Sequence, residues 1–335
     1  MNKEMESTEV RLGDVLLNIT GASIGRSAVY NIDAIANVNQ HVCIIRLRNN
    51  KNAQFLQMQL SSLRGQRQIQ LNQAGGGREG LNFQQISKMK FNFPSFDEIQ
   101  QIDRLLANIA DTIVLQQEKL DLLKQLKRGY LQKLFPVGNA KQPELRFAGF
   151  DGDWEQRKLE DVTKLSSGKN LPSVQNGRFF NVTMGSVLPN GVLKVTDKTN
   201  SEVDSLSLGD LIMPTRDIGH GDVIGITAVI PDSGAYVAGN CTFVLHSPTV
   251  DSKFLSAQIN TGSTRSEIIK RVSGSAQKMI KQSDILTLTI MVPSVEEQHK
   301  VSDFLSSLSA TVALQQGKLE SLQSLKQAFL QKLFV

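Results

Sequence analysis

The sequence LQQEKLDLLKQLKRGYLQKLF, from Leu115 to Phe135, occurs a second time in this chain as LQQGKLESLQSLKQAFLQKLF, from Leu314 to Phe334. The two copies are identical at 13 of 21 positions without a gap, and they lie 199 residues apart. An internal repeat of this kind indicates a duplicated structural unit. The architecture of the whole chain follows from this repeat.

Both copies carry a heptad seam, in which inward-facing positions recur every three or four residues. A continuous helix from Asp97 to Leu134 would extend about 57 Å at ~1.5 Å per residue. Polar residues recur at equivalent seam positions, where they can fix register and orientation. The predicted seam consists of Ile102, Leu106, Ile109, Ile113, Gln116, Leu120, Leu123, Lys127 and Tyr130 in the first copy, and of Val301, Leu305, Leu308, Val312, Gln315, Leu319, Leu322, Lys326 and Phe329 in the second.

Two interpretations of this seam are open. A heptad pattern is most often plain packing, and the two helices could belong to two unrelated partners. However, both copies lie in one chain, each behind a globular domain, so the economical arrangement is that they pair with each other. Antiparallel pairing would relate the two halves by a pseudo-twofold axis and would make the helices a spacer between two domains.

The repeat continues on the N-terminal side of both helices. Pro94-Ser95 corresponds to Pro293-Ser294, and GGGREGLNFQQI (75–86) corresponds to GSAQKMIKQSDI (274–285). With small changes of register, GDVLLNITGASIGRSAVY (13–30) also resembles GDLIMPTRDIGHGDVIGITAVI (209–230). Similarity is strong in the helices and weak before them, which predicts two copies of one module with constant helices and divergent variable parts.

The variable parts predict mixed α/β domains. Segments 42–47, 241–246 and 285–293 are apolar and β-branched, as is typical of buried strands. Segments 53–70 and 252–272 have the spacing of amphipathic helices. We therefore expect an α+β fold in which two mixed α/β domains are separated by two long helices that pair as an antiparallel coiled coil. The predicted boundaries are 1–95 for the first domain, 96–137 for the first spacer helix, 138–295 for the second domain and 296–335 for the second spacer helix.

The composition is that of a globular protein. The apolar fraction is 40%, no run of about 18 apolar residues occurs, and the polar start MNKEMESTEVRLGD is not a signal peptide. Two cysteines are too few for a disulfide framework or a zinc cluster, so a reducing cytoplasm is the simplest location. The net charge of +5 and the pI near 9.1 lean mildly towards polyanionic partners.

One segment carries a resemblance to a known family. PELRFAGFDGDWEQRKLEDV (143–162) is similar to the stretch that opens a target-recognition domain in the specificity subunits of type I restriction-modification systems. The Gly-Asp segments, the Pro-Ser turn into a long helix and the LQKLF ending resemble the same family. The duplicated order of these features extends the resemblance over nearly the whole chain.

The resemblance implies a non-catalytic subunit that reads double-stranded DNA. Each recognition domain would read one half of a bipartite target, and the two helices would fix the gap between the halves. Two modification (methyltransferase) subunits and the restriction (translocase and endonuclease) subunits would dock on it. S-adenosylmethionine, ATP and Mg²⁺ would bind in those partners, and this chain would hold no cofactor.

The first module departs from the second in one respect. The second module has WEQRKLEDVTKLSSGKNLPSVQNGRFFNVTMGS (154–186) before its Gly-Asp segment, whereas only MNKEMESTEVRL precedes Gly13. From this difference we expect the first recognition domain to be truncated at its N-terminus. A missing part could be supplied from elsewhere, so reading of the first half-site is in question.

Lysine and arginine side chains would supply affinity for DNA at phosphates, and side chains at base edges would supply specificity. In the PTRDIGHGD loop (214–222), Arg216 has the chemistry to bind guanine O6 and N7. For each candidate the alternative is a solvated surface charge. The candidates are Arg26, Arg46, Arg64, Arg67 and Arg78 in the first domain, and Lys169, Arg178, Arg216, His220, Arg265, Lys270, Arg271, Lys278 and Lys281 in the second.

No catalytic residue and no metal site is predicted. The four histidines show no pair at metal-ligand spacing, and the segments GGGREG and GSAQ do not match nucleotide-binding glycine loops. We expect Cys43 and Cys241, at equivalent points of the two copies, to be buried thiols on apolar strands.

Two alternative functions remain open at this point. One is a coiled-coil adaptor that holds two domains for a protein target. The other is a truncated, non-functional specificity subunit that still binds modification subunits, or that serves as a reservoir of recognition domains for recombination. Steeply salt-dependent binding to duplex DNA would separate a DNA reader from an adaptor.

Overall fold

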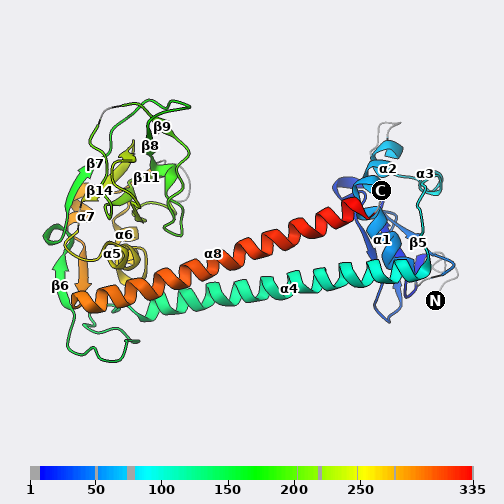
Figure 1. The fold of residues 1–335 in the computed structure, drawn as a ribbon, viewed down its shortest axis with the longest axis horizontal. Coiled ribbons are helices and arrows are strands. Elements are labelled where there is room, and N and C mark those ends of the chain that lie inside the picture. Colours follow the sequence, from blue (N-terminus) through cyan, green and yellow to red (C-terminus); the bar gives the residue numbers. More distant parts are fainter. Residues whose placement is uncertain are drawn as a thin grey trace. The chain divides into compact units, whose positions relative to one another are not determined.

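The computed structural model describes residues 8–49, 52–73, 80–201, 203–217, 221–246, 248–274 and 277–333, drawn as a coloured ribbon in Figure 1. It divides into two compact units, which we call the first unit (1–120 and 314–335) and the second unit (121–313). Each unit therefore combines one α/β domain with part of both long helices. None of the helices in the described ranges is long and apolar enough to cross a lipid bilayer.

The first domain is built on a three-stranded antiparallel sheet of order β3-β2-β5, and β1 pairs with β4. Two helices, α1 and α2, pack on the sheet, where Leu56, Leu60 and Ile69 join Val15 and Leu17 in one core. The elements are β1 (Glu9–Val10), β2 (Val15–Asn18), η2 (Gly21–Ser23), β3 (Ser27–Val29), β4 (Ala36–Asn37), β5 (Val42–Ile45), α1 (Ala53–Ser61), α2 (Leu63–Gln73) and α3 (Phe83–Ser87).

The second domain has a four-stranded sheet of order β12-β10-β14-β7 and a three-stranded sheet of order β13-β8-β9. Two further strand pairs, β11-β15 and β16-β6, complete it. Its elements are β6 (Glu155–Lys158), η4 (Leu159–Asp161), β7 (Lys164–Ser167), β8 (Phe179–Val182), η5 (Met184–Ser186), β9 (Lys198–Thr199), β10 (Leu211–Pro214), β11 (Arg216–Asp217), β12 (Ala228–Val229), β13 (Tyr236–Ala238), β14 (Thr242–His246), α5 (Ser252–Ile259), α6 (Gly262–Arg271), β15 (Lys278–Met279), α7 (Gln282–Leu286) and β16 (Thr289–Val292).

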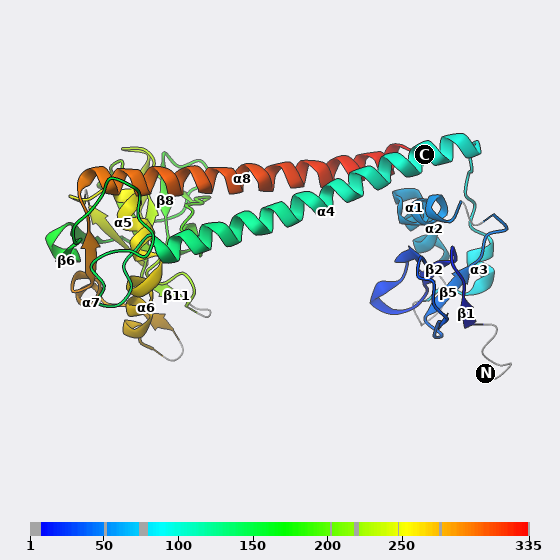
Figure 2. The same cartoon turned by 90° about the horizontal axis from the view of Figure 1, so that it is seen from below.

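Two long helices, α4 (Phe96–Lys133) and α8 (Val295–Lys332), contribute to both units. In the first unit the start of α4 packs against the end of α8, which lies beside α1 (Figure 2). In the second unit the end of α4 meets the start of α8, where the rings of Tyr130 and Phe304 make an edge-to-face contact at 4.8 Å. The helices therefore run antiparallel within each unit.

The faces by which α4 and α8 pack follow the heptad pattern. Every predicted seam residue is buried or half-buried, whereas Leu115 and Leu122, which lie off the seam, are exposed. In the first unit Gln315 Nε2 donates to Gln116 Oε1 at 2.6 Å and to the Gln116 carbonyl at 3.1 Å. In the second unit burial lowers the pKa of Lys127.

Both segments expected to be single helices are helix pairs. Ser62 is extended (ψ 162°) between α1 and α2, and a Cβ on Gly65 would meet the Gln59 carbonyl at 2.0 Å. In the second domain Thr261 is extended (ψ 168°) and Gly262 adopts a φ of 57° between α5 and α6. Helical periodicity continues through both breaks, so the sequence pattern alone did not reveal them.

Two smaller expectations are also wrong. The expected strand 285–293 begins as a helix, because the Asp284 side chain accepts the backbone N–H of Lys281 and caps α7; only 289–292 form a strand. Cys241 is half-buried in a turn with a φ of 59° just before β14, and is not on a strand. Cys43 lies on β5 as expected, and burial raises the pKa of its thiol.

Candidate nucleic-acid interface

Each domain has a Gly-Asp corner immediately before its central strand. Gly13 and Gly209 adopt φ values of 87° and 86°, a conformation that favours glycine. The two corners make equivalent backbone hydrogen bonds. The Gly13 N–H donates to the Tyr30 carbonyl at 2.9 Å, and the Gly209 N–H donates to the Ile230 carbonyl at 3.0 Å. The conserved geometry shows that the repeat seen in the sequence extends to individual hydrogen bonds.

Arg46 is bound to the buried carboxylate of the first corner. Its Nε and Nη2 atoms donate to Asp14 Oδ1 and Oδ2 at 2.8 and 2.7 Å. Burial opposes ionisation of Asp14, but the bonds from Arg46 and from the Arg11 backbone outweigh it and hold the pKa of Asp14 below its usual value. In the second domain His246 Nδ1 approaches Asp210 Oδ2 at 3.5 Å. The guanidinium of Arg46 is therefore committed to the fold, and we do not retain it as a DNA contact.

Three candidates in the second domain are also engaged within the protein. Arg265 donates to the carbonyls of Asp222 and Ile224, and burial lowers its pKa. Arg271 donates to the Asp284 carbonyl and to the Thr287 hydroxyl. Lys270 forms an exposed ion pair with Glu267 at 3.5 Å. Arg265 binds the segment 222–224 to α6, and Arg271 binds α7 to α6, so both are poor candidates for base or phosphate contacts.

A second set of candidates is exposed. Six of these side chains form no hydrogen bond or ion pair with any described residue, and they are Arg26, Arg64, Arg67, Lys169, Arg216 and Lys281. The exposed guanidinium of Arg178 stacks on the ring of Phe179, 5.0 Å from its centroid. Lys278, on β15, is half-buried and interacts within the protein. Arg78 and His220 lie outside the described residues.

Arg216 projects from a backbone that is fixed on both sides. The preceding residue, Thr215, donates to the Cys241 carbonyl at 2.9 Å and accepts from Ile280 N–H at 3.0 Å. Arg216 itself pairs with Met279 in the β11–β15 ladder. A cation on such an anchored strand can be presented to a ligand with little loss of conformational entropy.

The first domain has the same scaffold with different side chains. The Ile19 N–H donates to the His41 carbonyl at 2.9 Å, and the Ile19 carbonyl accepts the Leu81 N–H at 2.9 Å. Thr215 makes the two equivalent bonds in the second domain. The next residue is Thr20, whose hydroxyl lies 2.6 Å from His41 Nδ1. One scaffold thus presents arginine in one domain and a threonine–histidine pair in the other, which is suited to two different base contacts.

A hollow of about 380 Å³ lies beside this position in the first domain. Arg26 lines it together with the amides of Asn18, Asn37 and Asn39. The Asn18 Oδ1 atom is buried and has no hydrogen-bond partner among the described residues. Amides and a guanidinium together can donate to and accept from base edges.

The second domain also has a group of rings and cations that sequence reasoning largely missed. The rings of Phe180 and Tyr236 stack on the sheet β13-β8-β9, with their centroids 5.2 Å apart. Lys198 Nζ lies 5.0 Å from the centroid of the Phe180 ring. Arg178, just before β8, stacks instead on Phe179, whose side chain alternates with that of Phe180 along the strand. The sequence signal was an arginine next to two phenylalanines, but Lys198 and Tyr236 are distant in the chain and join the group only in the fold.

Within the described residues no three His, Cys, Asp or Glu side chains come together in a way that could hold a metal ion. The side chains described above offer cations, amides, hydroxyls and rings, which suit binding to phosphates and bases.

The duplicated scaffold agrees with the comparison to known families. The sequence model of the type I restriction modification DNA specificity domain matches residues 6–125 and 151–324, well over half of the chain. The chain belongs to this family. The resemblance noted in the sequence is thereby confirmed.

Relatives and solved structures agree with this membership. The type I restriction enzyme MjaVIII specificity subunit of Methanocaldococcus jannaschii is 24% identical over 255 residues, which are 72% of this chain and 60% of the relative. The chain thus spans about three fifths of the length of that relative. A type I restriction-modification S subunit from M. genitalium has a TM-score of 0.62 at 14% identity, covering 98% of this chain and 84% of its own.

A second solved structure, from work on assembly and conformational transition of a type I restriction-modification system, also has a TM-score of 0.62. It is 18% identical and covers 96% of this chain and 81% of its own. The expected α+β fold with two domains and two long helices is confirmed by these likenesses.

Proposed function

We propose that this chain is the DNA-reading specificity subunit of a type I restriction-modification complex. Each domain would read one part of a bipartite target, and the paired helices α4 and α8 would set the gap between the parts. The observation that carries this proposal is the duplicated scaffold, which presents the half-buried Thr20 and the exposed Arg26 in one domain and the exposed Arg216 in the other. Membership of the DNA specificity domain family supports the same proposal.

The contacts we propose divide into two kinds. Base edges would be contacted at two places. One is Arg216 with Asp217 on β11, and the other is the hollow lined by Arg26 and Asn18. At each place a guanidinium can donate and a neighbouring carboxylate or amide oxygen can accept. Lys169 and Lys281, with Arg64 and Arg67, would neutralise phosphates, since exposed flexible cations position DNA without reading it. Lys198, over the ring of Phe180, and Arg178, over the ring of Phe179, would contact the backbone of the DNA.

The chemistry would lie in partner subunits. Modification subunits would bring S-adenosylmethionine and restriction subunits would bring ATP and Mg²⁺, while this chain would contribute recognition without catalysis. Two modification subunits would match the antiparallel pairing of α4 with α8, because a pseudo-twofold chain offers two similar docking faces.

The proposal is tested by co-expressing the chain with its modification subunit in a methylation-free host and mapping modified adenines. A bipartite motif with a fixed gap is the expected result. A motif with a single defined half would mean that only one domain reads DNA. If the complex co-purified and no site were methylated, the reading function would be refuted and a subunit without recognition would remain.

A further inference from the structure

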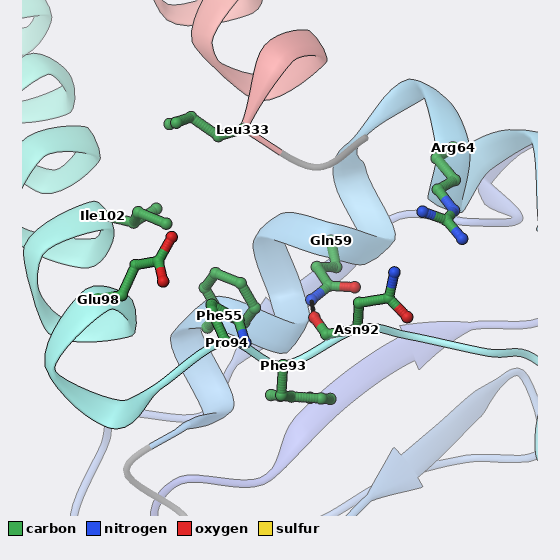
Figure 3. Close-up of a pocket in the computed structure, with 9 residues that line it drawn as sticks. All are labelled: Phe55, Gln59, Arg64, Asn92, Phe93, Pro94, Glu98, Ile102 and Leu333. Atoms are coloured by element: carbon green, nitrogen blue, oxygen red, sulfur yellow. Dashed lines mark hydrogen bonds between the residues drawn. The ribbon is translucent and has the colours of Figure 1, made fainter.

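Side-chain hydrogen bonds that stabilise the two domains recur in both copies of the module. In the first unit Gln59, which lines the pocket of about 260 Å³ drawn in Figure 3, donates through Nε2 to the Asn92 carbonyl. In the second unit Gln258 Nε2 donates to the Met291 carbonyl at 2.9 Å, and both residues lie 199 positions further along the chain. Where one copy departs from a shared contact, the departure indicates a property that belongs to one domain.

The two Gly-Asp corners are built from equivalent bonds around a buried carboxylate. Asp14 Oδ2 accepts the Arg11 N–H at 2.7 Å, and Asp210 Oδ2 accepts the Ser207 N–H at 2.9 Å. The two aspartates are 2% and 1% exposed, and each lies directly before the central strand of its sheet. A buried carboxylate is costly unless donors or cations bind it. The residue that faces this carboxylate therefore decides how firmly the corner is held.

The residue that faces the carboxylate is the point at which the two copies differ. β2 pairs with β5 in the same register as β10 pairs with β14. In this register Arg46, which follows β5, and His246, which ends β14, occupy equivalent places beside the aspartate. Arginine keeps its charge throughout the physiological range of pH, whereas histidine gains its charge as pH falls from about 8 to about 5.

The ring of His246 lies between the carboxylate and a hydroxyl. Its Nδ1 atom is 3.5 Å from Asp210 Oδ2, and its Nε2 atom is 2.6 Å from the Ser166 hydroxyl on β7. A protonated imidazole donates from both nitrogens, so the ring can then bind both groups at once and neutralise Asp210. A neutral imidazole has one N–H and no charge. It cannot supply the positive charge that Arg46 supplies to Asp14.

The elements beside His246 also carry charged side chains, which are Lys164 on β7 and Glu160 and Asp161 on η4. Lys164 is exposed and lies opposite His246 in the β7–β14 ladder. The two carboxylates of η4 accept hydrogen bonds from Lys158. Among the described residues, Asp210 is the carboxylate that forms an ion pair with His246. The charge of the ring therefore acts chiefly on the buried corner.

We propose that His246 is a pH-sensitive switch in the second domain: its protonated ring binds the Gly-Asp corner to β7, and this contact weakens as the ring loses its proton. Stability that depends on a bound proton is lost as pH rises. The first corner should not respond in this range, because Arg46 donates to Asp14 at 2.8 and 2.7 Å and stays charged. The inference rests on the fold and stands whether or not the chain reads DNA.

The test is hydrogen exchange of the full chain by mass spectrometry, at about pH 5.5 and about pH 8, corrected for the intrinsic pH dependence of exchange. Segment 206–211 contains the Ser207 and Gly209 amides of the second corner. Its protection should fall roughly threefold at the higher pH, the size expected when one partner of the ion pair is partly exposed. Segment 10–15 of the first corner should keep its protection.

An exchange of the two basic residues supplies the variants. His246→Arg should protect the second corner at both pH values, and His246→Gln should leave it less protected at both, because neither side chain titrates in this range. Arg46→His should transfer the pH dependence to segment 10–15. His299→Gln is the matched control, at an exposed histidine of α8 in the same unit, and should leave the pH dependence of segment 206–211 unchanged.

Two outcomes would overturn the proposal. Equal protection of segment 206–211 at the two pH values in the natural chain would show that the corner does not respond to a proton. A loss of protection at the higher pH that persisted in His246→Arg and His246→Gln would assign the response to another group. If Arg46→His failed to fold, the two variants of His246 would still decide between these results.

Discussion

Asp103 is a carboxyl group placed at a position where the repeat otherwise has a hydroxyl. Its Oδ1 atom is buried without a hydrogen-bond partner among the described residues, and burial raises its pKa to about 6. At the corresponding position of α8, Ser302 donates to the side chain of Asp251, which caps α5. The ionised form of Asp103 therefore weakens the packing of α4 at neutral pH.

We predict that Asp103→Ser stabilises the protein at pH 7. The folded pKa lies above the unfolded value, so the folded state holds an extra proton between about pH 4 and pH 6, and stability of the natural protein falls as pH rises through that window. The gain in free energy of unfolding at pH 7 should be about 1 kcal/mol. It is smaller than the pKa shift of Asp103 alone would give, because solvent screens this carboxylate. Urea unfolding at pH 4, 5, 6 and 7 measures it.

Asp111→Ser provides the matched control, since Asp111 is an exposed carboxylate on the same helix. This variant should keep the pH dependence of the natural protein. If Asp103→Ser showed that same dependence between pH 4 and 6, Asp103 would not be the group responsible.

Arg46 and Arg216 show how one residue type takes two roles. Arg46→Ala would leave Asp14, which is 2% exposed, buried without its partner, and should cost about 2 kcal/mol of unfolding free energy. Because the pKa of Asp14 is held below its usual value, that loss should shrink as pH falls below about 4. Arg216→Ala should leave the melting temperature unchanged, because the side chain is exposed and makes no hydrogen bond with a described residue. It should weaken binding to the DNA sequence that methylation mapping identifies as the target.

The measurement pairs thermal unfolding with a DNA-binding titration for both variants. Lys281→Ala should lower affinity for specific and random duplexes alike, which separates phosphate contacts from base contacts. Loss of stability in Arg216→Ala, or full DNA binding by it, would remove Arg216 from the interface. The sequence could not make this distinction, because the partner of Arg46 lies 32 residues away at Asp14.

At the scale of elements, the sequence predicted those features that depend on the spacing of apolar residues. The long helices and their buried faces follow directly from the heptad spacing. The breaks at Ser62 and Thr261 depend on one extended residue each and on close packing of the following turn, which periodicity does not register. The helix α7 depends on a single capping aspartate, Asp284, just before the apolar segment that starts at Ile285.

The pair Gln116–Gln315 is the element-scale feature whose energetics can be tested. Gln315→Leu alone should destabilise the protein by about 1 kcal/mol, because Gln116 would lose its partner in a half-buried seam. The double variant Gln116→Leu with Gln315→Leu should instead be as stable as the natural chain or more so. Urea unfolding of the two variants measures the difference.

Gln323→Leu is the control, at an exposed position of α8. It should change stability by less than about 0.5 kcal/mol. Equal effects of Gln315→Leu and Gln323→Leu would show that the hydrogen bond across the seam contributes nothing to the fold.

At the scale of the whole molecule, duplication explains both what was predictable and what was not. The repeat predicted two similar modules, and bonds such as those of Gly13 and Gly209 recur in each. It did not predict the differences between the copies: Arg146 pairs with Glu297 in the second unit, whereas the corresponding Glu98 forms no ion pair with any described residue of the first unit. Differences of this kind depend on which segment folds back onto which surface.

The spacer hypothesis makes a prediction that only the whole molecule can test. One heptad inserted after Leu120 of α4 and one after Ala313 of α8 would keep the seam in phase, because seven residues restore the heptad register. The inserted helix adds about 10 Å, which corresponds to at most about three base pairs at ~3.4 Å each. Methylation mapping should show a longer gap between unchanged half-sites.

An insertion in α4 alone is the matched control. It would shift every seam contact beyond the insertion by one heptad against α8, so the pairing of Tyr130 with Phe304 and of Gln116 with Gln315 could not form together. We expect this variant to melt at a lower temperature and to methylate no bipartite site. A gap that stayed the same in the doubly extended chain would show that the helices do not set the distance between half-sites, because any rigid pairing of α4 with α8 must transmit the added length.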